Sequence, residues 1–548
     1  MSIETPADLV LRGGRIFTAD AARTWAQALA VRGGRIVRVG GDRDVQPLIG
    51  AGTRVIGLRG RTVTPGFGDA HVHPPMAGMA RIGCELHDIR GKHEYLRIIR
   101  EYADSHPDEA WINGGGWTLA DFPGGIPRRE DLDAIVPDRP VFLPNRDGHD
   151  AWVNSKALEI AGITAATPDP TSGIIDRDED GTPNGCLHEG AMELVLSLIP
   201  PPTTETYKRA TLESQRYLHS LGITNWQDAW VTPETEAAYL ELAASGELTA
   251  RVVGAMWWER DQGLEQIDGF VERRARGVIG RFAATSVKLM CDGVVENQTA
   301  SMTEPYFDGH GHQTTNRGRD FIDPAVLREA VIRIDALGLQ PHFHALGDRA
   351  VRQALDAVEA ARRANGWSDT RPHLAHIQVV HPDDHARFRA LGALANAQPL
   401  WAAEEDQMSE LTLPFLGPVV SARQYPFRSL RRAGATLVMG SDWSVSTPDP
   451  FPQMEVAVNR ISPENRGNAP FIPDERLDLV DILAAATAGS AYASHLDAAG
   501  VLAVGRLADI AVLDRDLFDR GTGPIGDTRV LATFVEGEAV YEAPGLDD

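Results

Sequence analysis

The sequence has few cysteines and no long apolar run. Cys84, Cys186 and Cys291 are far apart in the 548 residues and match no metal-ligand spacing. Any disulfide pairing would leave one of them over, which favours a reducing compartment. The N-terminus lacks the basic start and apolar stretch of a signal peptide, and no segment approaches the about 20 apolar residues that span a membrane. The sequence therefore predicts a cytoplasmic protein without a membrane partner.

Basic residues are also few compared with acidic ones. The chain has 53 Lys and Arg against 77 Asp and Glu, so its net charge is −24. Because nucleic acids and anionic membrane faces are bound through basic patches, this balance argues against both as partners. The acidic residues are spread along the chain, as expected for a solvated surface.

Two histidines end a short apolar, glycine-rich segment, Thr64-Pro-Gly-Phe-Gly-Asp-Ala-His-Val-His73. On a strand, side chains two residues apart lie on the same face, so His71 and His73 would point to one place. Pro74 then stops further strand pairing. Two converging imidazoles suit a divalent transition metal, although a pair of surface histidines is the alternative.

From about residue 205 the chain alternates between helical and strand-like segments. Further strand-like segments start near residues 223, 250, 285, 339, 373, 393 and 435, and helices are expected over 207–221, 324–337, 350–365 and 383–391. With the His71 strand this makes eight strands alternating with helices, the pattern of a (β/α)8 TIM-like barrel over residues 63–487. A doubly wound open sheet is the alternative, but no Gly-x-Gly-x-x-Gly follows any strand.

The two ends of the chain and residues 74–205 differ from this α/β region in their pattern of apolar and turn residues. Residues 8–62 and the C-terminal end combine apolar residues with glycine turns at hairpin spacing. Since hairpins are marginal alone, we expect residues 1–62 and 488–548 to form one small composite β-sandwich domain; two separate terminal domains are the alternative. Residues 74–205 look like a long irregular insertion after the first barrel strand, with short helices near 92–104 and 189–199.

Metal-binding residue types recur at the predicted carboxyl ends of the strands, where barrel enzymes place their catalytic groups. They are Lys288, His342, His344, His373, His376 and Asp442. Taken singly, Asp442 could only cap a turn, and His342 and His373 could be core histidines or outer partners of ligands. The recurrence strengthens the metal interpretation of His71 and His73.

Lys288 lies within a hydrophobic strand. Burial favours the neutral amine of a lysine, and carbon dioxide can convert that amine into a carbamate that bridges two metals. A plain lysine that orients substrate or water is the alternative. A Schiff-base lysine in a metal-independent enzyme is a further one, which the clustered histidines disfavour.

Together these motifs resemble the amidohydrolase superfamily, in particular the YtcJ-like (amidohydrolase 3 type) branch that includes N-substituted formamide deformylases. The resemblance covers nearly the whole chain. Its residues are Pro65-Gly-Phe-Gly-Asp-Ala-His-Val-His73, Asp147-Gly-His-Asp-Ala-Trp-Val-Asn-Ser155, Gly185-Cys-Leu-His-Glu189, Val287-Lys-Leu-Met-Cys-Asp-Gly293, His344-Ala-Leu-Gly-Asp-Arg-Ala350, His376-Ile-Gln and Gly440-Ser-Asp-Trp443.

The resemblance implies a set of metal ligands, namely His71, His73, His344, His376 and Asp442, with Lys288 as a candidate carbamate. It adds Glu189 as a ligand or acid–base group, the alternative being a glutamate favoured at a helix N-terminus. There is one departure: Ala375 stands where the branch usually has a glutamate. Ala375 and the additional imidazole of His342 make the residues around the ligands differ from those of the branch, while the ligands themselves are retained.

These residues predict a hydrolase of a C–N bond in an amide or N-substituted formamide. One or two divalent ions, foremost Zn²⁺, would lower the pKa of a bound water to about 7, and the resulting hydroxide would attack the carbonyl carbon. Asp442 would take the proton and pass it to the leaving nitrogen. Hydrolysis of carbamates, cyclic amides or esters, and deamination, are alternatives; a non-catalytic binding barrel is disfavoured because every expected ligand position is filled.

Aromatic residues near the predicted strand ends and in the insertion suit a small neutral substrate with an apolar or aromatic group. We assign Trp117, His149, His342 and Trp443 to substrate binding, with ordinary packing as the alternative for the tryptophans. By default, the oligomer is predicted to be a homodimer.

Overall fold

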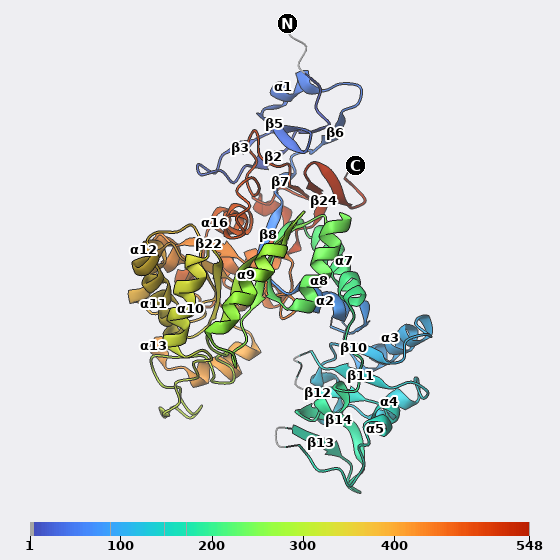
Figure 1. The fold of residues 1–548 in the computed structure, drawn as a ribbon. Coiled ribbons are helices and arrows are strands. Elements are labelled where there is room, and N and C mark those ends of the chain that lie inside the picture. Colours follow the sequence, from blue (N-terminus) through green and yellow to red (C-terminus); the bar gives the residue numbers. More distant parts are fainter. Residues whose placement is uncertain (1–4, 88, 147, 149, 171–172, 547–548) are drawn as a thin grey trace. The chain divides into compact units, whose positions relative to one another are not determined.

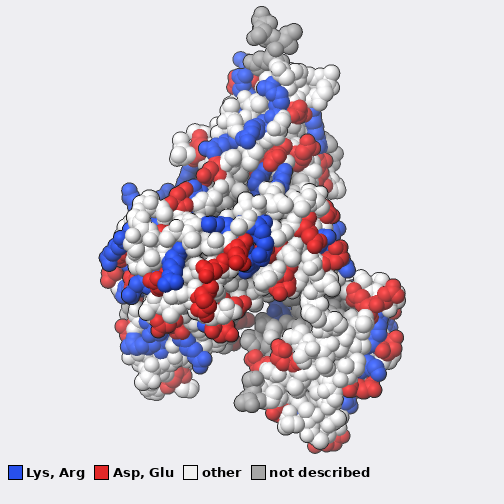
Figure 2. All heavy atoms as spheres, in the orientation of Figure 1, with Lys and Arg blue, Asp and Glu red and all other residues white. Residues whose placement is uncertain are grey.

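The computed structural model describes residues 5–87, 89–146, 148, 150–170 and 173–546. The chain divides into two compact units, one made of Met1–Pro74 and Gln215–Asp548 and the other of Pro75–Ser214. On the face drawn in Figure 2, basic and acidic side chains are interspersed over both units. Within the described part of the chain, no helix combines the length and the apolar character needed to cross a membrane.

Eight parallel strands of the first unit form a nearly closed barrel, which confirms the predicted TIM-like fold. Each strand is hydrogen-bonded to the next, and most of their residues are buried, as in parallel sheets covered on both faces. In spatial order they are β8 (Phe67–Val72), β15 (Ile223–Val231), β16 (Arg251–Trp257), β18 (Phe282–Met290), β19 (Gln340–Ala345), β20 (His373–His376), β21 (Leu394–Ala397) and β22 (Thr436–Met439). These are the strands expected from the sequence.

The first and last strands meet at their carboxyl ends. The Asp442 N–H donates to the His71 carbonyl at 2.7 Å, and the His73 N–H donates to the Trp443 carbonyl at 2.7 Å. Asp69 on β8 adds a side-chain clamp, because its carboxylate accepts hydrogen bonds from the backbone N–H and the hydroxyl of Ser441. Barrel closure therefore places His71 on β8, and His73 directly after it, beside Asp442.

Helices follow most of the barrel strands (Figure 1). The longest, α11, buries Val351, Ala354, Leu355 and Val358, which recur at helical spacing along one face. The helices after β15 to β21 include α8 (Pro233–Ser245), α9 (Ile267–Arg276), α10 (Pro324–Ala336), α11 (Asp348–Asn365), α12 (His385–Leu391) and α14 (Phe427–Arg432).

The two ends of the chain share one sheet, which Figure 1 shows as blue and red strands side by side. In this six-stranded sheet of order β25-β24-β23-β7-β2-β3, β23 (Ile510–Leu513) pairs with β7 (Thr62–Pro65). The other strands are β2 (Arg15–Phe17), β3 (Trp25–Ala26), β24 (Val530–Val535) and β25 (Glu538–Glu542). A second sheet, formed by the N-terminal part of the chain, has four strands. They are β5 (Arg35–Gly40), β4 (Ala28–Arg32), β1 (Leu9–Arg12) and β6 (Arg54–Gly57). Side chains from both sheets and both ends form one apolar core. Its status as a domain separate from the barrel stays a prediction.

The insertion is more regular than expected. It contains a six-stranded mixed sheet of β13 (Gly173–Arg177), β14 (Pro183–Glu189), β12 (Asp150–Val153), β11 (Val141–Pro144), β10 (Ile112–Gly115) and β9 (Cys84–Glu85). The run Gly114-Gly-Gly116 includes part of β10, where a Cβ on Gly114 would lie 2.1 Å from the Cys84 carbonyl oxygen. Glycine is needed there for close strand approach. Helix α3 (Lys92–Ser105) matches its prediction, whereas that at 189–199 is reduced to α6 (Glu193–Leu196).

Candidate metal centre

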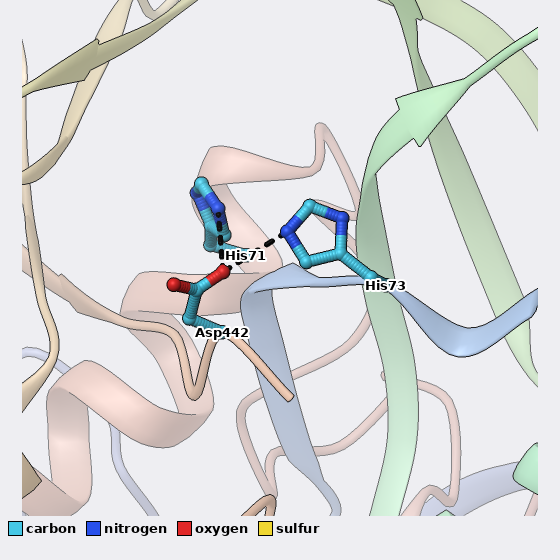
Figure 3. A group of neighbouring side chains, drawn as sticks. All are labelled: His71, His73 and Asp442. Atoms are coloured by element: carbon cyan, nitrogen blue, oxygen red, sulfur yellow. Dashed lines mark hydrogen bonds and ion pairs between the residues drawn. The ribbon is translucent and has the colours of Figure 1, made fainter. Parts of the chain in front are cut away.

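Three predicted ligands meet at the carboxyl end of the barrel. His71 and His73 come from the end of β8, and Asp442 follows β22; their ligand atoms all lie within 4.8 Å of one another. Oδ1 of Asp442 is 3.2 Å from Nε2 of His71 and 3.0 Å from Nε2 of His73. Figure 3 shows the carboxylate pointing toward both imidazoles.

Lys288 reaches the same cluster from β18. Its Nζ lies 3.2 Å from Nε2 of His71, and the residue is only 3% exposed. Burial lowers the pKa of Lys288 to about 8, with partial compensation by Asp442. A substantial fraction of this amine is therefore neutral near pH 8, which is the form that carbon dioxide can carboxylate.

His344 and His376 extend the cluster to one side. The His376 ring lies 4.8 Å from the His71 ring and 4.4 Å from the His344 ring, between centroids. Nδ1 of His376 is 4.0 Å from Oδ2 of Asp442. Nε2 of His344 donates to the Gly293 carbonyl at 3.3 Å, which leaves its Nδ1 as the acceptor atom.

The protonation states of these groups fit a divalent cation. Burial would raise the pKa of Asp442, but the neighbouring His71, His73 and His376 hold it well below its ordinary value. Burial lowers the pKa of His71 and of His376 well below the ordinary value, and that of His344 to about 3. An ionised carboxylate beside the neutral imidazoles of His71, His344 and His376 is a donor set that suits a divalent metal.

Unpaired nitrogen atoms point in the same direction. Among the residues that the structure describes, neither ring nitrogen of His376 has a hydrogen-bond partner, although the residue is only 3% exposed. Buried polar atoms are normally paired. His376 and Asp442 also have positive φ angles of 75° and 60°, a strained backbone that concentrates at functional sites. The residues present therefore fit a metal.

The comparison with known proteins agrees with this geometry, since the amidohydrolase family matches residues 54–541. The chain belongs to the amidohydrolase family. It is 32% identical over 98% of its length to Protein LONG AFTER FAR-RED 3 of Arabidopsis thaliana, covering 92% of that protein. It is 29% identical to N-substituted formamide deformylase of Arthrobacter pascens, covering 98% and 99% of the two chains. An uncharacterized metal-dependent hydrolase from Pyrococcus furiosus has a related structure, with a TM-score of 0.74, 27% identity and coverage of 93% and 99%.

His342 occupies an unexpected position for a substrate-binding residue of this amidohydrolase. It is fully buried, and its Nε2 lies 2.8 Å from Nδ1 of His71. Its ring also packs at 3.9 Å, between centroids, on the ring of His373. His342 thus contacts the ring nitrogen of His71 that faces away from Asp442. This position supports the alternative, that His342 is an outer partner of a metal ligand, over the assignment to substrate binding.

The other predicted substrate residues have different surroundings. Trp443 lies at the cluster, where its carbonyl accepts from His73 and its ring contacts Tyr217 at 5.3 Å. Trp117 is fully buried in the core of the insertion, and its indole N–H donates to the Leu143 carbonyl at 2.7 Å. This is the ordinary packing that the sequence allowed. His149 lies outside the described residues. Glu189 ends β14 of the insertion, and its role stays a prediction.

Two buried carboxylates, Asp292 and Asp69, support the site but were not among the site residues predicted from the sequence. Asp292 accepts hydrogen bonds from the backbone N–H groups of Ser301, Leu346 and Gly347. Asp69 performs the equivalent role at the β8–β22 junction. Burial raises the pKa of each to about 7. Both lie within the family motifs, Gly-Asp-Ala-His and Cys-Asp-Gly, which was the available sequence signal.

Proposed function

We propose that the protein hydrolyses the C–N bond of a small neutral amide, with N-substituted formamides as the substrate class and a divalent metal as cofactor. The observation that supports this most directly is the convergence of His71, His73 and Asp442 within 4.8 Å at the carboxyl end of the barrel. The relative named N-substituted formamide deformylase, which aligns with 98% of this chain, supports the substrate class.

His71, His73 and Asp442 would hold the first ion, for which zinc suits the imidazoles. His344 and His376, with Lys288 as an amine or a carbamate, would complete this site or hold a second ion. When bound, the metal acidifies a water and polarises the substrate carbonyl. Asp442 accepts the proton of the attacking water as its oxygen bonds to the carbonyl carbon. As the C–N bond breaks, Asp442 passes that proton to the leaving nitrogen, which releases an amine and a carboxylic acid.

Lys288 decides how many ions the proposed site holds. We expect Lys288→Ala to lower both the metal content per chain and the turnover, since the buried amine or its carbamate contacts the cluster at His71. Metal analysis and kinetics measure both quantities, and Lys156→Ala, at an exposed ion pair of the insertion, is the control. Metal content in Lys288→Ala equal to that of the wild type would exclude a ligand role for Lys288.

The substrate class can be tested directly by hydrolysis assays. Trp230, which is 39% exposed, lies edge-on to His73 at 6.4 Å and stacks on Trp257 at 4.8 Å, between centroids. This apolar wall suits an aryl or alkyl substituent. We expect the metal-loaded protein to have its highest kcat/KM on formamides and acyl amines with such groups. Preferred turnover of carbamates, cyclic amides or esters, or release of ammonia by deamination, would assign it to one of those alternatives.

A further inference from the structure

The hydrogen bond between His71 and His342 determines which nitrogen of His71 is available to a metal. Nε2 of His71 lies 3.2 Å from both Asp442 Oδ1 and Lys288 Nζ, so this atom faces the cluster. Nδ1 of the same ring lies 2.8 Å from Nε2 of His342. A neutral imidazole carries one hydrogen, and to bind a metal through Nε2 it must carry that hydrogen on Nδ1.

His342 is placed to accept that hydrogen. It lies on β19, next to β18, with Lys288 as its cross-strand neighbour on one side and His373 on the other. His342 is fully buried, and its Nδ1 has no hydrogen-bond partner among the described residues. Among these residues, the side chain of His342 therefore has one hydrogen-bond partner, His71. Nε2 of His342 serves as the acceptor when Nδ1 of His71 donates.

The position of His342 is itself held from the far side. Its ring packs at 3.9 Å on that of His373, whose Nδ1 accepts from the Asn396 side-chain amide at 3.2 Å. The same amide nitrogen donates to the Ala70 carbonyl at 3.0 Å, one residue before His71. Side chains from β19, β20 and β21 therefore form a buried row behind β8, and this row limits the movement of the His342 ring.

We propose that His342 is a positioning residue that holds His71 in the tautomer with hydrogen on Nδ1 and so directs Nε2 of His71 to the metal. The inference rests on the proposed metal-dependent function. The usual outer partner of a ligating histidine is a carboxylate, a carbonyl or water. A neutral imidazole in that place orients the ligand without adding a negative charge beneath the metal.

The experiment measures Co²⁺ binding to the full-length protein after metal removal, by titration and by the visible spectrum of the bound ion. We expect His342→Leu to weaken Co²⁺ binding by about 10- to 100-fold and to alter the spectrum. His342→Gln should restore both, because its side-chain oxygen can replace Nε2 as acceptor. The matched control is His219→Leu, which removes another buried imidazole of the same unit, one whose partners are Ile223 and Thr249, and it should bind Co²⁺ like the wild type.

His342→Phe keeps an aromatic ring against His373 and takes the place of the leucine variant if that variant does not fold. Wild-type affinity and spectrum in a folded His342→Leu or His342→Phe would overturn the positioning role while leaving the metal-dependent function intact. Equal weakening by His219→Leu would also overturn it, since the effect would then come from loss of core packing. Failure of the wild type to bind Co²⁺ would overturn both proposals.

Discussion

Asp442→Asn is expected to retain its metal and lose turnover by about 10²- to 10⁴-fold, the usual contribution of a general acid–base group. Asparagine keeps the size of the side chain and one oxygen that can face His71 and His73. Its amide cannot accept the proton of the attacking water. Metal content per chain and kcat at saturating metal measure the two effects separately.

The matched control for this variant is Asp449→Asn, seven residues further along the chain. The Asp449 carboxylate caps helix α15 (Pro450–Asn459) by accepting from the Phe451 N–H at 3.0 Å. Asparagine is an equally good cap, so this variant should turn over substrate like the wild type. Near wild-type turnover in Asp442→Asn would show that the proton acceptor is another group.

Arg251→Ala is expected to cause the largest loss of stability, about 3–5 kcal/mol, because it leaves a buried charge without its partner. Arg251 begins β16 and forms ion pairs with Asp509 and Glu536 of the C-terminal β-rich segment. Arg251 is 8% exposed and Asp509 is 2% exposed. The Asp509 carboxylate also accepts the Glu536 N–H at 2.9 Å, so the lost cation leaves a carboxylate fixed in a buried position.

Urea unfolding followed by tryptophan fluorescence measures this loss. Arg15→Ala is the control, because the Arg15–Asp516 pair also involves the C-terminal β-rich segment but has the Arg15 side chain 46% exposed. Such surface pairs contribute about 0–1 kcal/mol. The double variant Arg251→Met with Asp509→Leu should recover stability, since it removes both buried charges. A loss in Arg251→Ala no greater than in Arg15→Ala would contradict the importance of the buried pair.

Local patterns in the sequence were sufficient for the barrel and for its ligand types. Strands and helices differ in hydrophobic period, and the barrel strands, buried on both faces, are apolar runs of recognisable length. Because all barrel strands point the same way, residues at their carboxyl ends such as Lys288, His376 and Asp442 must lie on one face. Their shared position follows from strand direction alone, without knowledge of the packing.

The insertion shows where such patterns fail. Its glycines resemble a loop, but at Gly114 the absence of a side chain permits close approach of β10 to β9. From the sequence, Trp117 was predicted to bind substrate, yet its side chain packs in the apolar core of the insertion. Glycine in a tight strand and glycine in a loop have the same local signature, so only the neighbouring strand distinguishes them.

The sequence by itself determined the fold class, the order of the barrel strands and the residue types at their ends, since each depends on a short stretch of chain. Tertiary structure alone decided which of these residues touch. His73 and Asp442, 369 positions apart, come together through closure between β8 and β22. His342, 271 positions from His71, lies behind it because the inward-facing side chains of β19 pack inside the barrel. Contacts at such separations depend on strand stagger and side-chain packing, which no local pattern encodes.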